Sequence, residues 1–445
     1  MKIKNIIFLL LTAVALTSCD NFLDITPTGK VIAKTGEEYR ALLTYEYKYF
    51  SKDRYMTTLR TDEIVMNTKT SSTDLDAYVD LWRWKDENPA PTTSYFTWRN
   101  YYHAIYIANY IMGHQHEISN ATAAEVSQLM GEAYMMRAYA HFLLVNLYAE
   151  PYTHCNPATT RGVPMLLEAD VNAIPGSSSV DAIYLQVLKD LDEAEKYMKV
   201  EAWEIGENYR FNTVSIQALR ARTYLYMGRW SDALEAAKAV IEAKPELEDL
   251  NTSKTLPNSY LSVESIVALE KFSSNLFTAI DQPDPNLIAL YRTGDLRRTK
   301  YYKRVSSSTY SLLKGGDDEF SCSFRVAEAY LIAAESAARL GNLADAVDYL
   351  KPLMEKRLNA DAYQTTLDLI TPMTQDELIA EVLDERAREL AFEGHRWYDL
   401  RRTTQPTLTR VYNGEIFTLT PEKYTMRFPT EAVEANPEIE RWETK

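Results

Sequence analysis

The chain has 445 residues, and its 48 Lys plus Arg stand against 63 Asp plus Glu, which gives a net charge of −15. This excess of acid leaves no basic footprint for a phosphate backbone, so the composition argues against nucleic acid as a partner. After the N-terminal leader no segment is apolar for the roughly 20 residues that a membrane-spanning helix needs, and we expect no transmembrane helix in the mature chain.

The N-terminus has the pattern of a secretory signal. Two lysines precede an apolar run from Ile6 to Leu16, and two small polar residues stand directly before Cys19. Leu16-Thr17-Ser18-Cys19 resembles the bacterial lipobox, in which a peptidase cleaves before a cysteine that carries a diacylglyceryl group. The alternative is an ordinary signal peptide with a chance cysteine. We predict a signal peptide over residues 1–18, lipidation at Cys19 and a lipidated tether over residues 19–34, because two or three acyl chains hold a protein firmly on a membrane.

Helical patterns dominate the chain from residue 35 onward. A first helix is expected near residues 37–50, and apolar side chains then recur at three- and four-residue steps in several segments. The clearest are Trp98, Tyr102, Ile105, Asn109 and Met112, then Ala133, Met136, Ala140, Leu143 and Leu147, then Leu188, Leu191, Ala194 and Met198. A helix with one apolar face cannot bury that face alone, so these helices are expected to pair.

The pairing has a tetratricopeptide-like period. Repeat positions are filled by Ala221, Tyr224, Gly228, Ala233, Ala237 and Pro245, and in a weaker second copy by Tyr330, Ala334, Ala337, Gly341, Ala346 and Leu350. The offset between the copies, 346 minus 233, is 113 residues, which is not a multiple of about 34. We therefore predict one mainly α-helical domain over residues 35–445, with helix pairs within about 97–246 and 324–402 and other structure between them.

Three segments interrupt the helices, at residues 62–91, 151–176 and 247–322, and they are rich in Pro, Ser, Thr, Asn and aromatic residues. Long loops in a compact domain are often functional. The last segment is expected to hold a few short strands, at residues 263–268 and 301–312. Beyond it, residues 376–402 return to helix, with Gly394 as the break.

An acidic run near the C-terminus is the strongest candidate for paired catalytic carboxylates. It holds Asp384, Glu385, Glu389 and Glu393, with Arg386, Arg388 and Arg396 among them. Acids and arginines that alternate at helical spacing favour a structural ion-pair network that fixes helix packing, rather than a catalytic site. Since P-loop, HExxH and GxSxG motifs are also missing, we predict no enzyme and no cofactor.

Histidine and cysteine give little sign of a metal site. His114-Gln115-His116 could present two imidazoles to an ion, but no further ligands accompany them, so we predict no bound metal. Apart from Cys19 the cysteines are Cys155 and Cys322, whose spacing matches no zinc pattern. They leave two alternatives open, which are one disulfide or two separate thiols.

Several stretches along nearly the whole mature chain match one known family. They are Cys19 to Asp24 followed by Pro27, Thr61-Asp62-Glu63, Trp98 to Asn109, Glu132 to Pro151, Arg325 to Glu335, and Glu385 to Leu400. In these residues the chain resembles the SusD-like (RagB-like) family of outer-membrane nutrient-binding lipoproteins. The tail departs from the family pattern, because Tyr424 with Phe428-Pro429 stands where "YPIP" is usual.

The resemblance implies a SusD-like fold, with tetratricopeptide-type helix pairs, long irregular loops and a few short strands, and an activity without chemistry. Members of the family bind oligosaccharides, or peptides in the RagB branch, and lie as a hinged lid on a SusC-like TonB-dependent transporter that imports the cargo. We therefore expect a lipoprotein at the outer membrane, facing outside, with these ligands and that partner. The rival classes are a tetratricopeptide scaffold for protein partners and a surface enzyme, and the signal, lipobox and family motifs disfavour the scaffold.

Aromatic residues are the candidates for contacts with a ligand, since sugar rings stack on their faces. The chain has 31 Tyr, 13 Phe and 7 Trp, and those at helical spacing are expected in the core. The family implies that its ligand site forms where the loops about 61–95 and 247–322 converge. We predict that seven residues of these loops contact the ligand, because we expect their side chains to be free of the core. They are Asp62, Asn67, Trp82, Trp84, Phe272, Asn275 and Phe277.

Overall fold

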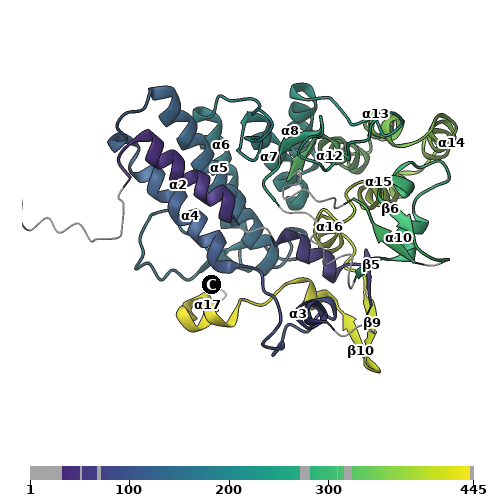
Figure 1. Cartoon of the computed structure of the whole chain (residues 1–445), viewed down its shortest axis with the longest axis horizontal. Coiled ribbons are helices and arrows are strands. Elements are labelled where there is room, and N and C mark those ends of the chain that lie inside the picture. The colour runs from purple at the N-terminus through teal and green to yellow at the C-terminus, as the bar shows by residue number, and fades with distance from the viewer. Residues whose placement is uncertain are drawn as a thin grey trace, which may run out of the picture.

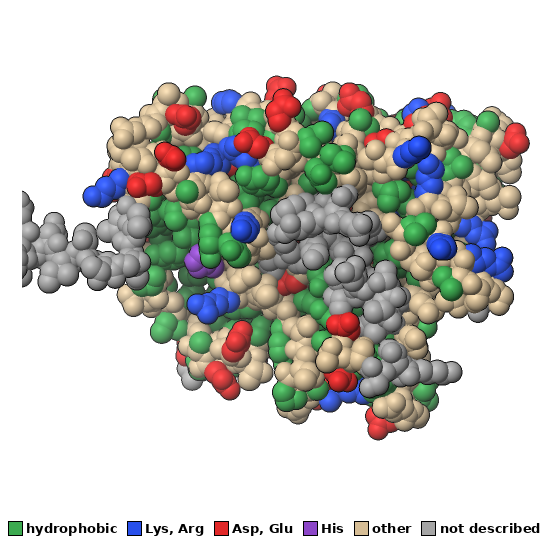
Figure 2. All heavy atoms as spheres, viewed as in Figure 1, with side chains coloured by type: hydrophobic (Ala, Val, Ile, Leu, Met, Phe, Trp, Pro, Cys, Tyr) green, Lys and Arg blue, Asp and Glu red, His purple; other side chains and the backbone are tan. Residues whose placement is uncertain are grey.

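The computed structural model describes residues 33–50, 53–67, 72–270, 281–307, 309–314 and 323–440 (Figure 1). More than half of the residues are helical and about a tenth lie in strands, which confirms the prediction of a mainly α-helical protein. No helix in these ranges is both long and apolar enough to cross a membrane. Figure 2 shows acidic and basic side chains interspersed over most of one face, with a small basic group near strand β6 (Tyr302–Arg304).

The helices follow the expected order along the chain. Their bounds are α2 Gly36–Tyr49, α3 Thr73–Trp82, α4 Trp98–Gly113, α5 Ala123–Tyr148, α6 Val180–Tyr197, α7 Thr213–Met227, α8 Trp230–Ala243, α10 Pro285–Ala289, α11 Arg297–Lys300, α12 Val326–Arg339, α13 Leu343–Arg357, α14 Ala360–Ile370, α15 Gln375–Glu389, α16 Arg396–Arg402 and α17 Thr430–Ala435. Short 3₁₀ turns lie at Arg54–Arg60, Gln115–Glu117, Tyr152–His154, Pro421–Tyr424 and Pro437–Ile439.

Helix α5 is the central, buried helix of the N-terminal half. From Gln128 to its last residue nearly every side chain is buried, because the helix packs against α2, α4 and α6. A helix that is apolar on all sides has to be covered on all sides. Its start is fixed by a capping box, in which Thr122 Oγ1 accepts from the Glu125 N–H while Glu125 accepts from the Thr122 N–H.

The predicted helix pairs form. In α7 and α8 the small residues Ala221, Ala233 and Ala237 are fully buried at the contact, and Gly228 ends α7 with a positive φ of 71°. This left-handed conformation suits glycine and turns the chain back into α8. In the second pair, α12 and α13, Gly341 has the same role with φ 83°.

The array is interrupted in sequence but continuous in space. Helix α12 packs on α8 although its start at Val326 is 83 positions beyond the end of α8 at Ala243, and α12 also contacts α13 and α15 (Figure 1). The segment between the two pairs leaves the array and returns to it. The helices α12 to α15 therefore enclose a second apolar core, which includes Leu331, Leu350 and Leu378.

All strands of the described residues pair two by two and antiparallel. The pairs are β1 Ile64–Met66 with β5 Asp281–Pro283, β2 Arg161–Pro164 with β3 Ser177–Ser179, β4 Ser265–Val267 with β8 Phe324–Arg325, β6 Tyr302–Arg304 with β7 Tyr310–Leu312, and β9 Leu408–Tyr412 with β10 Glu415–Leu419. The strands expected at residues 263–268 and 301–312 are confirmed by β4, β6 and β7. Gly394, at φ 68°, separates α15 from α16 as predicted.

The segment 62–91 is less irregular than the sequence indicated. Its Ser- and Thr-rich part starts helix α3, where Ser72 Oγ accepts from the Leu75 N–H at 3.1 Å. Two aspartates in the first turn favour this end of the helix, because they complement its dipole. The prediction of a continuous loop here was wrong, since these residues cap a helix rather than interrupt one.

Candidate ligand pocket

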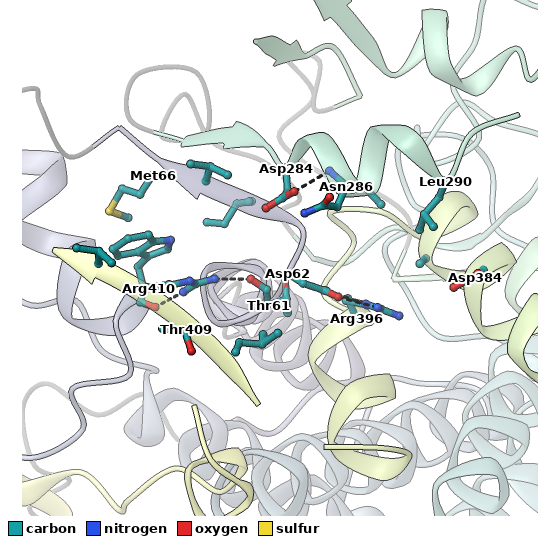
Figure 3. Close-up of a pocket in the computed structure, with 17 residues that line it drawn as sticks. Thr61, Asp62, Met66, Asp284, Asn286, Leu290, Asp384, Arg396, Thr409 and Arg410 are labelled. Carbon is teal, nitrogen blue, oxygen red and sulfur yellow. Dashed lines mark hydrogen bonds and ion pairs between the residues drawn. The ribbon is translucent and has the colours of Figure 1, made fainter. Parts of the chain in front are cut away.

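A cavity of about 640 Å³ opens where four distant parts of the chain meet (Figure 3). It lies beside β1 and β5, between α10, the α15–α16 junction and β9. Its lining consists of Thr61, Asp62, Ile64, Val65, Met66, Trp82, Asp284, Asn286, Leu287, Leu290, Asp384, Ala387, Arg396, Leu408, Thr409, Arg410 and Val411. The mixture of apolar walls with a few carboxylate, amide and hydroxyl groups is typical of a small-molecule site.

The turn Thr61-Asp62-Glu63 in the cavity wall is bonded to two distant elements of the fold. Asp62 forms a two-point ion pair with Arg396, at 2.8 Å from Nε and 2.7 Å from Nη2 (Figure 3). Arg410 of β9 donates to the backbone carbonyl of Thr61 and to that of Trp82. The turn is thus tied to α16 on one side and to the β9–β10 hairpin on the other.

Glu63 holds the same turn through a buried hydrogen bond. It is 1% exposed, and its Oε1 accepts from the backbone N–H of Phe392 at 2.9 Å. Burial raises the pKa of Glu63 to about 7, although the Phe392 N–H stabilises the anion and opposes the shift. The neighbouring charge of Asp62 raises the pKa further. A carboxyl group that titrates near neutral pH therefore lies directly behind the cavity wall.

The pairing of β1 with β5 joins the two loop regions that the sequence singled out. Met66 lies opposite Asp281 and Ile64 opposite Pro283. Strand β5 therefore lies along β1, and the chain after it enters α10. Asp284 caps this helix, since its Oδ1 accepts from the Asn286 N–H at 2.7 Å, and Pro285 follows at the first helical position.

Of the predicted ligand contacts, the structure brings Asp62 and Trp82 together in the cavity lining. Asn67 is exposed and directly follows β1. Phe272, Asn275 and Phe277 lie outside the described residues. A ligand role for each of these residues stays a prediction.

The expectation that Trp82 and Trp84 are loop side chains free of the core is wrong. Trp82 is the last residue of α3 and is 5% exposed, and Trp84 is 2% exposed with its indole N–H donating to the Arg60 carbonyl at 2.9 Å. The guanidinium of Arg410 lies 4.8 Å from the Trp82 ring and 4.3 Å from the Trp84 ring, and so covers both. Their alternation reflects the end of a buried helix.

Several lining residues were missed by the sequence analysis. Asp284-Pro285 is a recognisable helix start, and Asn413-Gly414 is a recognisable hairpin turn, here with φ 50° and 82°. The first pattern predicts the start of α10 and the second predicts the β9–β10 hairpin, but neither predicts that α10 and β9 line the same cavity. Only the tertiary contacts place Asn286 and Thr409 beside Asp62.

The acidic run of α15 and its neighbourhood form the predicted structural ion-pair network. Glu389 is fully buried and accepts from Arg297 at 3.0 Å, Arg325 at 2.7 Å and Arg357 at 2.9 Å. Further buried pairs are Arg297 with Asp295 and Glu385, Arg325 with Glu264 and Glu393, Arg388 with Glu381 and Glu385, Lys314 with Glu393, and Arg386 with Asp399. The prediction of a structural network is confirmed for Glu385, Glu389, Glu393, Arg386 and Arg388, with the correction that Asp384 and Arg396 belong to the cavity wall.

No group of three or more His, Cys, Asp or Glu side chains in the described ranges has the geometry of a metal site. His114 Nδ1 lies 2.8 Å from the Tyr110 carbonyl, within its own helix turn. Cys155 is a free, half-buried thiol, and Cys322 falls outside the described residues, as does Cys19.

The chain is similar to known proteins over nearly its whole length. The family model described as "SusD family" matches residues 288–440, and the one described as "Starch-binding associating with outer membrane" matches residues 23–225. SusD-like protein P38 of Formosa agariphila is 25% identical over 91% of this chain and 92% of its own. SusD-like protein P2 of the same organism is 34% identical over 44% of this chain and 36% of its own.

Solved structures agree with the sequence matches. A SusD superfamily protein from Bacteroides thetaiotaomicron superposes with a TM-score of 0.76 at 20% identity, covering 92% of this chain and all of that one. A laminarin-binding SusD-like protein superposes with a TM-score of 0.63 at 19% identity, covering 84% of this chain and 92% of that one. The two family models match different halves of the chain, and relatives and solved folds span nearly all of it. The chain belongs to the SusD/RagB-like family.

Proposed function

We propose that this protein binds oligosaccharides in the cavity beside β1 and β5 and does not transform them. The observation that carries the proposal is the cavity itself, in which polar groups of Asp62, Asn286 and Thr409 converge with apolar side chains of Val65 and Val411. Sugar hydroxyls both donate and accept hydrogen bonds, and the C–H faces of sugar rings pack on apolar surface. A lining of this kind can satisfy both.

The lining supports binding rather than catalysis. Among its described residues there is no serine, cysteine or histidine that a neighbouring base could activate as a nucleophile. The carboxylate of Asp62 is held by Arg396. Glu385 and Glu389, buried on α15, are each held by arginines in ion pairs.

The test uses side chains that face the cavity without supporting the fold. Asn286 and Thr409 are exposed, and among the described residues their side chains form no intramolecular hydrogen bond. Asn286→Ala and Thr409→Ala should therefore leave the melting temperature unchanged. After a glycan screen has identified a ligand, calorimetry should show affinity reduced by roughly 1 to 2 kcal/mol for each variant. Gln364→Ala, an exposed amide on α14, is the matched control.

Unchanged binding by both cavity variants would place the glycan site elsewhere. A screen in which peptides bind and glycans do not would replace the oligosaccharide by a peptide ligand, as in the RagB branch. Binding of neither class would refute a capture role at this cavity.

The cellular setting follows from the N-terminal pattern and the family. We propose a lipid on Cys19 that holds the protein at the outer membrane, facing outside, where it delivers its ligand to a SusC-like TonB-dependent transporter. The description of one matching family model names association with the outer membrane. Cys19→Ala should abolish acylation and release the protein from membranes of a strain that lacks the transporter. Retention of that variant on such membranes would contradict the lipid anchor.

A further inference from the structure

The charges that line the cavity are not balanced. This inference rests on the proposed function, since it concerns which sugars the same cavity accepts. Three carboxylates line it, on Asp62, Asp284 and Asp384, together with the two guanidinium groups of Arg396 and Arg410. Asp62 and Arg396 neutralise each other through their two-point ion pair.

The second cation is turned to the protein and not to the cavity. Arg410 is 9% exposed, and it donates to the backbone carbonyls of Leu59, Thr61 and Trp82. Its plane also lies against the rings of Trp82 and Trp84. An incoming anion would have to compete with these carbonyls for the guanidinium.

The two remaining carboxylates form no ion pair with a cation of the described residues. Within the described ranges no ion pair joins Asp284 or Asp384 to a lysine or arginine. Arg388, which lies one helical turn after Asp384, is engaged by Glu381 at 2.5 Å and Glu385 at 2.7 Å. Burial raises the pKa of Asp384, and the charges of Arg388, Arg396 and Arg292 offset this only in part. Figure 3 shows Asp284 and Asp384 on different parts of the wall, so negative charge faces the cavity from more than one side.

We propose that the cavity takes sugars that are neutral or carry an amino group and excludes sugars that carry carboxylate or sulfate groups. A uronate or sulfate would meet two unpaired carboxylates in a partly desolvated space, where like charges repel more strongly than in water. A protonated amine would instead gain a partner in Asp384. Hydroxyl groups can donate to either carboxylate without any charge penalty.

The experiment is a glycan array read with the intact mature protein. The array carries neutral β-glucan oligomers, chitosan oligomers, polyuronate oligomers and sulfated galactan oligomers of matched length. We expect binding to members of the first two classes, and affinity for the acidic classes at least about tenfold weaker. The variant pair Asp284→Asn with Asp384→Asn should reduce that discrimination by about tenfold while neutral sugars still bind. Asparagine keeps the capping role of Asp284, so the fold is retained.

The controls separate this inference from the function on which it rests. Asp345→Asn with Asp361→Asn, two exposed aspartates outside the lining, removes the same two charges and should leave the preference unchanged, which excludes an effect of net charge alone. Acidic glycans that bind the parent as tightly as neutral ones would overturn the charge selectivity and leave oligosaccharide binding intact. A screen in which no glycan of any class binds would overturn the proposed function, and the selectivity with it.

Discussion

The ion-pair network around α15 and the cavity wall beside it are both rich in buried or half-buried carboxylates, yet the protein treats their charge in opposite ways. In the network Glu389 is surrounded by Arg297, Arg325 and Arg357, all of them buried. In the cavity wall Asp284 and Asp384 have no such partner among the described residues. A charge that is paired at every oxygen can fix helix packing, whereas one left open to solvent can meet a ligand.

Two fully buried glutamates show the same contrast in their titration. Burial alone would raise the pKa of Glu335, but the guanidinium of Arg402, with those of Arg386 and Arg339, lowers it to about 2. Burial raises the pKa of Glu63 to about 7, because a backbone N–H, the charge of Arg396 and a threonine hydroxyl oppose it only in part. Burial of a carboxylate thus sets neither its charge nor its role, which depend on its partners.

The largest effect is expected from breaking the network at its centre. Glu389→Ala leaves three buried arginines without their shared acceptor, and the free energy of unfolding should fall by roughly 3 to 5 kcal/mol. Urea denaturation at neutral pH measures it. Glu355→Ala, an exposed glutamate on the neighbouring helix α13, is the control and should change stability by less than about 0.5 kcal/mol. A loss below about 1 kcal/mol for Glu389→Ala would show that the network does not hold the helices together.

A smaller effect, opposite in sign for the two glutamates, is expected from pH. The lowered pKa of Glu335 stabilises the folded state above its ordinary value of 4.5, and this contribution is lost as pH falls toward 2. The raised pKa of Glu63 means that folding favours its protonated form, so stability is lost as pH rises from 4.5 through 7. Each shift corresponds to at most roughly 3 kcal/mol.

Substitution by glutamine removes the titrating carboxyl group, so the change in unfolding free energy shows whether that group stabilises or destabilises the fold at a given pH. Glu335→Gln should destabilise the protein near neutral pH, whereas Glu63→Gln should stabilise it above pH about 7 and have little effect below pH about 4.5. Unfolding free energies of both variants and the parent, measured at about pH 5 and about pH 8, give the comparison. If Glu63→Gln destabilised the protein at the higher pH, the ionised form of Glu63 would be the one that holds the turn.

Local sequence signals were sufficient for most of the helical array. The steps of three and four residues located α4, α5 and α6, and the small residues with Gly228 located the α7–α8 pair. These features depend on contacts between near neighbours, which the chain encodes within one or two turns. The alternation of acids and arginines in α15 likewise indicated ion pairs, although not that the partners of Glu385 and Glu389 come from residues 297, 325 and 357.

The cavity could be predicted only in part. Asp62 was a candidate because of the Thr61-Asp62-Glu63 motif, and Trp82 because it is aromatic. The burial of Trp84, in contrast, depends on Arg410, which is 326 positions away in the chain. A pattern within one segment carries no information about which distant segment covers it. The loops around residues 61–95 and 247–322 were expected to converge, and the β1–β5 pairing is the contact through which they meet.

The amino-acid sequence by itself determined the helical class, the paired repeats, the structural role of the α15 charges and the family, since each depends on local periodicity or on a contiguous motif. The tertiary structure decided which carboxylates are paired and which face the cavity. That division depends on where Arg396, Arg410 and the arginines of the network come to lie, and long-range packing rather than residue type sets their positions. The same residue type, aspartate or glutamate, therefore serves as a structural anchor in one region and as an open group in the other.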